Sequence, residues 1–130
     1  MKVDILAFGA HPDDVELGCG GSICKAISQG MVVGIIDLTK GELGTRGTPE
    51  IRKKESEKAS KILGVSFRKN LGFKDSFFVN DKDHQLKVVE VLREHQPSIV
   101  FCNAVKDRHI DHPKGSKLVS DSCFLSGLSK

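Results

Sequence analysis

The stretch that decides the fold is residues 3–21, which read Val-Asp-Ile-Leu-Ala-Phe-Gly-Ala-His-Pro-Asp-Asp-Val-Glu-Leu-Gly-Cys-Gly-Gly. Residues 3–8 form an apolar run that is typical of a buried strand. A polar loop follows, and we expect a helix from the glycine-rich region 18–21 to Gln29, with Gly30 ending it. A strand that passes into a helix in this way indicates an α/β fold.

The same alternation continues along the chain. Apolar runs at 31–38, 65–71 and 98–102 predict further strands. A second helix is expected to start at Thr48-Pro49, to end at Gly64 and to bury Ile51, Ala59, Ile62 and Leu63. Asn80 or Asp81 caps a third helix that runs to about His95, and a fourth starts near Pro113. The pattern predicts one domain over residues 1–130, with a Rossmann-like, mostly parallel sheet flanked by helices.

The loop after the first strand contains His11, Asp13 and Asp14. Ligands of open α/β sheets bind outside the carboxyl ends of the strands, which is where this loop lies. A histidine and a carboxylate three residues apart suit a metal ion, and the carboxylate between them is available as a general base. Alone, such a string is as often a turn in which Pro sets φ and Asp caps a helix.

A second polar segment, residues 107–112, reads Asp-Arg-His-Ile-Asp-His and also follows a predicted strand. If both strands belong to one parallel sheet, the two loops emerge at the same edge and His112 can join His11 and Asp14. Two imidazoles and one carboxylate with further positions open are typical of catalytic zinc, and Asp13 would then accept a proton from water. A lone His-x-x-His is more often a surface pair, so the joint occurrence carries the prediction.

Composition excludes several other classes of protein. The 130 residues carry a formal net charge of only +3, and no Trp or Tyr is present to stack on bases. The densest basic run, residues 52–54, is interleaved with glutamates, so we expect no nucleic-acid partner. No Gly-x-Gly-x-x-Gly joins a strand to a helix, which disfavours dinucleotide binding. Four cysteines without a Cys-x-x-Cys pair, and no signal peptide or membrane-length apolar run, predict a cytoplasmic protein without a membrane partner.

The Ala-His-Pro-Asp-Asp loop and the later His-x-Asp-His resemble the hallmarks of the LmbE-like (PIG-L) zinc-dependent deacetylases, and the resemblance covers the whole chain. Residues 39–48, Thr-Lys-Gly-Glu-Leu-Gly-Thr-Arg-Gly-Thr, are similar to the branch that deacetylates N-acetylglucosaminyl-malate in bacillithiol biosynthesis. The resemblance implies hydrolysis of an N-acetyl group from a small N-acetylglucosamine conjugate, with release of acetate and a free amine.

The resemblance also implies roles for individual residues. His11, Asp14 and His112 would bind Zn²⁺, with Fe²⁺ as the alternative ion, and Asp13 would be the general base. His109 would stabilise the oxyanion or act as an acid, with Asp111 orienting its imidazole. Glu42 would contact the sugar hydroxyls of the substrate, and Arg52 and Arg108 would contact its carboxylate groups. For Arg52, an exposed helix arginine is an equally good interpretation.

Family members continue considerably further, and their later segments complete the sheet and the pocket. We therefore expect this chain to lack the C-terminal portion of the family fold. The alternative function is a truncated, inactive homologue that binds metal or a protein partner through apolar surface that is left uncovered. We expect a homo-oligomer. A phosphatase is disfavoured because a second metal needs bridging carboxylates, for which only Glu16 is a candidate.

Overall fold

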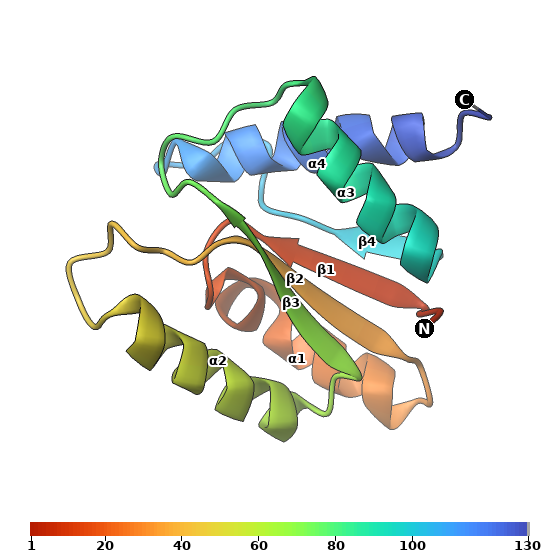
Figure 1. Ribbon diagram of the computed structural model, residues 1–130. Helices are drawn as coiled ribbons and strands as arrows, with labels where there is room; N and C mark the ends of the chain where they lie inside the picture. Colours follow the sequence, from red (N-terminus) through yellow and green to blue (C-terminus); the bar gives the residue numbers. More distant parts are fainter. Residues whose placement is uncertain (130) are drawn as a thin grey trace.

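The computed structural model describes residues 1–129 and shows a parallel sheet between two pairs of helices (Figure 1). The strand order is β3-β2-β1-β4, and all neighbouring strands pair in parallel. The strands are β1 (Ile5–Gly9), β2 (Val33–Thr39), β3 (Phe67–Phe73) and β4 (Ile99–Phe101), and the helices are α1 (Asp14–Ser28), α2 (Pro49–Leu63), α3 (Lys82–His95) and α4 (Asp111–Ser126). The predicted fold class is confirmed.

Two apolar clusters hold the layers together, one on each face of the sheet. Side chains alternate along a strand, so Leu6 and Phe8 of β1 face the cluster under α3 and α4, whereas Ile5 and Ala7 face α1. All residues of β1 and β2 are buried, as expected for the central strands of a sheet that is covered on both faces. Figure 1 shows α1 and α2 on one face and α3 and α4 on the other.

Local capping signals set the helix ends. Thr48 accepts a hydrogen bond from the amide of Ile51 at 3.2 Å, Pro49 occupies the first turn of α2, and Gly64 ends this helix in the left-handed conformation. Asp81 caps α3 in the same way. Helix α1 begins at Asp14, earlier than the glycine-rich region from which we expected it, because residues 14–18 already form helical turns before an irregular backbone at Cys19.

The predicted buried face of α2 is wrong. None of its residues is buried, and the Ile51 and Ile62 side chains are 48% and 84% exposed. Helix α2 lies against α1 and the edge strand β3, so only its side chains nearest to them, such as Leu63, reach the apolar cluster.

The parallel arrangement places the segments that follow all four strands at one edge of the sheet. Residues 10–13 follow β1, residues 40–48 follow β2, residues 74–81 follow β3 and residues 102–110 follow β4. These segments, together with the first turns of α1, α2 and α4, carry the residues that the sequence singled out. No helix within residues 1–129 is both long and apolar enough to cross a membrane.

Candidate metal centre

The loops after β1 and β4 converge, as the sequence predicts. The Oδ2 atom of Asp14 lies 3.4 Å from Nδ1 of His11 and 3.2 Å from Nε2 of His112. Ligand atoms of these three residues all lie within 4.8 Å of one another. The same Asp14 oxygen accepts hydrogen bonds from the His11 amide at 2.9 Å and from Asn103 at 3.3 Å, which orient the carboxylate between the two rings.

Other carboxylates contact the outer nitrogen of each imidazole, which is the ring nitrogen that does not face Asp14. Nε2 of His11 lies 2.9 Å from Asp111 and 3.1 Å from Asp75, and Nδ1 of His112 lies 2.8 Å from Asp107. An ionised carboxylate only accepts, so each of these nitrogens carries the proton. The opposite nitrogen of each ring faces Asp14 and is the one that would offer its lone pair to a metal ion. Carboxylate–histidine pairs of this kind are typical of histidine metal ligands.

The charges of the carboxylates around His11 and His112 favour a cation at this site. Burial alone would raise the pKa of Asp14, but the hydrogen bonds with His11 outweigh it and lower the pKa below its usual range. Burial would lower the pKa of His11, but Asp14 and Asp111 outweigh this effect and raise it to about 9. The carboxylates around His11 thus favour positive charge at this point. A nitrogen–oxygen–nitrogen donor set with neighbouring carboxylates fits a divalent ion such as zinc.

Asp13 differs from its neighbour Asp14 in both exposure and backbone. Its side chain is 54% exposed, and its φ of 130° is rare for a residue other than glycine. Burial and the charge of Asp14 raise the pKa of Asp13, against the effect of Arg52. Strained backbone of this kind is frequent at functional sites, and here it directs the Asp13 carboxylate apart from that of Asp14, which lies among the candidate metal donors.

Arg52 is not the exposed helix arginine that the sequence left as an alternative. Its side chain is 18% exposed and donates to the carbonyl oxygens of Gly41 at 2.9 Å and Pro12 at 3.0 Å, with Asp13 at 3.7 Å. It therefore links α2 to both loops of the site. A guanidinium has five N–H donors, so some remain for a substrate.

Asp111 contacts the His109 ring through its backbone amide, and its role in orienting that imidazole stays a prediction. The carboxylate of Asp111 contacts His11, the Ser76 amide and Lys114, whereas His109 is held by the backbone amide of Asp111, which donates to Nδ1 at 3.1 Å. The neutral His109 ring therefore carries its proton on Nε2. Its ring centroid lies 4.6 Å from that of His11, so the imidazole still borders the metal donors. The Asp111 side chain is fully buried in the first turn of α4, and one of its carboxylate oxygens lies within 4.8 Å of ring nitrogens of both His11 and His109.

The two remaining predicted residues lie on exposed loops. Glu42 accepts a hydrogen bond from the backbone amide of Asp75 at 3.0 Å, which ties it to the site. Arg108 is exposed, and its side chain forms no hydrogen bond or ion pair with any residue in the range 1–129. Glu42 thus lies close to the metal donors, while Arg108 is a free cation in the segment that carries His109.

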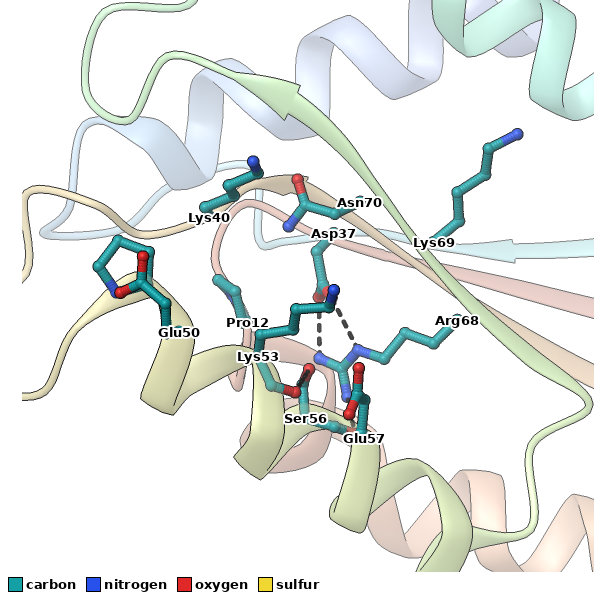
Figure 2. Close-up of a pocket in the computed structure, with 11 residues that line it drawn as sticks. Pro12, Asp37, Lys40, Glu50, Lys53, Ser56, Glu57, Arg68, Lys69 and Asn70 are labelled. Carbon is teal, nitrogen blue, oxygen red and sulfur yellow. Dashed lines mark hydrogen bonds and ion pairs between the residues drawn. The ribbon is translucent and has the colours of Figure 1, made fainter.

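A cavity of about 410 Å³ lies beside this edge, between α2 and the ends of β2 and β3 (Figure 2). Arg68 donates to both oxygens of the buried Asp37 at 2.7 and 2.9 Å, to both oxygens of Glu16 at 3.0 and 3.1 Å, and to the Ser56 carbonyl. All five guanidinium N–H groups are therefore occupied within the protein. This network joins β3 to β2 and to the first turn of α1. It therefore stabilises the helix start that directly follows the loop carrying His11.

Sequence reasoning missed three residues of the centre: Asn103, Asp107 and Asp75. Asn103 and Asp107 follow β4 within ten residues of His112, so their position at the strand end was a usable signal. Asp75 lies 64 residues from His11 along the chain, and no motif marks it.

The chain matches the family described as "PIG-L: GlcNAc-PI de-N-acetylase" over residues 6–123. The conserved protein TT1542 from Thermus thermophilus, a solved structure, is 46% identical with a TM-score of 0.94, over 98% of this chain and 58% of that one. Diacetylchitobiose deacetylase of Thermococcus kodakarensis is 31% identical over 95% of this chain and 50% of its own length. A probable N-acetyl-α-D-glucosaminyl L-malate deacetylase of Bacillus cereus is 32% identical over 86% of this chain and 57% of its own length. This chain thus spans between half and three fifths of the length of these relatives.

Proposed function

The chain belongs to the PIG-L family, and from this membership we propose that it carries the metal centre and general base of an N-deacetylase. The proposed reaction is hydrolysis of an N-acetylglucosamine unit, in which water cleaves the amide to acetate and a free amine. The observation that carries the proposal is the convergence of His11, Asp14 and His112 beside the separately oriented Asp13. A bound zinc ion acts as a Lewis acid toward an amide carbonyl and makes water more acidic. Fe²⁺ is the alternative ion, since the same donors accept both.

Asp13 is proposed to remove the proton of the attacking water. Its raised pKa, due to burial and the charge of Asp14, makes it a stronger base than an ordinary aspartate. Arg52, 3.7 Å from the carboxylate, limits this effect and restricts where the carboxylate can lie. After the C–N bond breaks, the proton held by Asp13 is available for the leaving amine.

His109 is proposed to stabilise the oxyanion of the tetrahedral intermediate. The Asp111 amide occupies Nδ1, so the free Nε2–H is the donor that the ring can present. Loss of one such donor typically costs ~2.7–4 kcal/mol in the transition state, which is a rate loss of about 10²–10³.

The substrate proposal rests on what the relatives have in common. The family and both curated relatives are named after substrates with an acetylated glucosamine unit, which is joined to a different group in each. Glu42, next to the centre, is suited to sugar hydroxyls. The exposed Arg108 side chain, which has no partner within residues 1–129, is suited to carboxylates, as is Arg52 through its remaining donors. This favours the malate conjugate.

The proposal is tested in two steps on the purified chain. We expect close to one equivalent of zinc or iron per chain in the wild type and in Asp13→Asn, and loss of the metal in His112→Ala. Released acetate is then measured with N-acetylglucosaminyl-malate and with diacetylchitobiose. We expect Asp13→Asn to lose at least a hundredfold in kcat, and Arg108→Ala to raise KM for the malate conjugate alone.

Each outcome separates the alternatives. A folded, metal-free wild type would overturn the metal centre. Stoichiometric metal without acetate release from either substrate would favour the inactive, metal-binding homologue. Full activity of Asp13→Asn would remove Asp13 as the base. The homo-oligomeric state and the cytoplasmic location stay predictions, the first to be checked by sedimentation of the metal-loaded chain.

A further inference from the structure

We infer that Asp75 is a positioning residue that couples the metal ligand His11 to the loop carrying Glu42, so that metal binding orders this loop. The inference rests on the proposed function for the identity of the metal ligand and of the loop, residues 41–47. It does not require the chain to turn over a substrate.

Asp75 uses every polar group that it presents to the site. Its side chain is almost fully buried, with Oδ1 lying 3.1 Å from Nε2 of His11 and Oδ2 accepting from the Leu43 amide at 2.9 Å. Its backbone amide donates to Oε2 of Glu42 at 3.0 Å. One residue therefore bonds to a metal ligand through one carboxylate oxygen and to the loop through the other oxygen and its amide.

The contact with His11 duplicates one that already exists. Asp111 accepts from the same Nε2 at 2.9 Å, and its carboxylate is sufficient to set the tautomer of His11. What Asp75 adds is the connection to the loop. A second buried carboxylate beside one imidazole costs desolvation free energy. A hydrogen bond to the Leu43 amide alone would not require Asp75 to lie beside His11.

The loop has few other attachments. Gly41 is held by Thr39 and Arg52, but the bonds that join Glu42 and Leu43 to the rest of the described chain are the two made with Asp75. Residues 42–48 are exposed, so packing does not hold them in place. The position of Glu42 therefore depends on the position of Asp75.

The turn that carries Asp75 is itself well anchored. Ser76 adopts a φ of 64°, which is uncommon for serine, and its amide donates to Asp111 at 2.9 Å. Phe78 is buried in the apolar cluster, and its amide bonds to the Lys74 carbonyl at 2.8 Å. Because the turn is held at both ends, the side chain of Asp75 can transmit a change at His11 without moving the backbone.

A cation held by His11, Asp14 and His112 would fix the orientation of the His11 ring, and with it the direction of the Nε2–H group that faces Asp75. Asp75 is then held more firmly, and with it the Leu43 amide. We expect zinc to slow hydrogen exchange at Leu43 by roughly two- to tenfold, the range expected for strengthening one hydrogen bond. Because coupling is reciprocal, a ligand held by Glu42 should tighten zinc binding by the factor by which zinc tightens the binding of that ligand.

The test is amide exchange of the whole chain, measured residue by residue with and without zinc. The matched control is the amide of Val32, which also bonds to an aspartate carboxylate, that of Asp4 at 2.7 Å, but beside the amino end of β1, the opposite edge of the sheet. We expect zinc to slow exchange at Leu43 and to leave Val32 unchanged. Zinc binding with no change at Leu43 would overturn the coupling while leaving the metal centre intact.

Asp75→Asn provides the second arm. The amide has a single acceptor oxygen, so it cannot serve both His11 and Leu43, and its NH₂ group must face one of these donors. We expect the zinc-dependent protection of Leu43 to disappear while zinc affinity falls no more than about tenfold, because Asp111 still holds His11. Retained protection in this variant would overturn the role of Asp75. Failure to bind zinc in the wild type would overturn both this inference and the proposed centre, whereas zinc binding without acetate release would affect the proposed activity alone.

Discussion

Replacement of Arg68 by methionine should destabilise the chain in a way that depends on pH. Arg68 is the only cation that contacts Asp37 in residues 1–129, through two hydrogen bonds of 2.7 and 2.9 Å, and the two side chains are 8% and 3% exposed. Removal of one partner from such a buried pair typically costs about 3–5 kcal/mol. Methionine preserves much of the apolar volume, so the loss reports the unpaired carboxylate and the lost bonds to Glu16.

The pH dependence follows from the pKa of Asp37. Burial raises this pKa from 3.8 to about 6 even with Arg68 present. A carboxyl group with a raised pKa binds its proton more tightly in the folded chain, so its contribution to stability falls as the pH rises through that pKa. In the wild type this fall ends just above pH 6. Without Arg68 the pKa rises further, so the variant keeps losing ~1.4 kcal/mol per pH unit above pH 6, or about 2 kcal/mol by pH 7.5.

The assay is urea unfolding followed by circular dichroism at pH 5.5 and 7.5 and constant ionic strength. We expect Arg68→Met to lose about 3–5 kcal/mol at pH 7.5 and ~2 kcal/mol less than that at pH 5.5. Lys69→Met is the control, because this neighbouring lysine is half exposed and its pair with Glu94 is 3.9 Å long; its change should stay within about 0.5 kcal/mol at both pH values. A loss below about 1 kcal/mol at pH 7.5, or an equal loss at both pH values, would refute the reasoning.

Three further predictions concern the site and its loops. Asp107→Asn should weaken zinc binding by about 10- to 100-fold in a competition titration, because His112 loses the carboxylate that sets its tautomer; unchanged affinity would contradict this. Zinc at a hundredfold excess over its Kd should stabilise the wild type by ~2.7 kcal/mol in urea unfolding, and a chelator should reverse the gain. Gly41→Ala should cost about 1–3 kcal/mol, since Gly41 has a φ of 63° and a Cβ there would meet Arg52. Gly18→Ala, at an open helical position, should instead be neutral or stabilising, and equal effects would show that neither strain nor crowding matters at Gly41.

Much of the fold could be predicted because its signals are local. The apolar runs of β1 and β2 are buried on both faces, and the capping residues Thr48, Gly64 and Asp81 lie where the helices begin and end. The failures are positions where burial depends on a neighbouring element. Ile62 has the apolar character of a core residue, yet α2 lies at the edge of the layer and leaves it exposed.

The meeting of His11, Asp14 and His112 was also predictable, since strand ends in a parallel sheet share one edge. The partners of their outer nitrogens were not, with the contact between Asp111 and His11 as the clearest example.

The sequence by itself therefore determined the order of strands and helices and the edge at which the candidate metal donors gather, because hydrophobic periodicity, caps and strand direction act over a few residues. The tertiary structure alone decided which carboxylate holds which imidazole. Asp75 and His11 are 64 residues apart, and Asp111 and His11 are 100 apart. Their contact depends on the angle at which α4 and the turn after β3 pack against the sheet, and no local pattern encodes that angle.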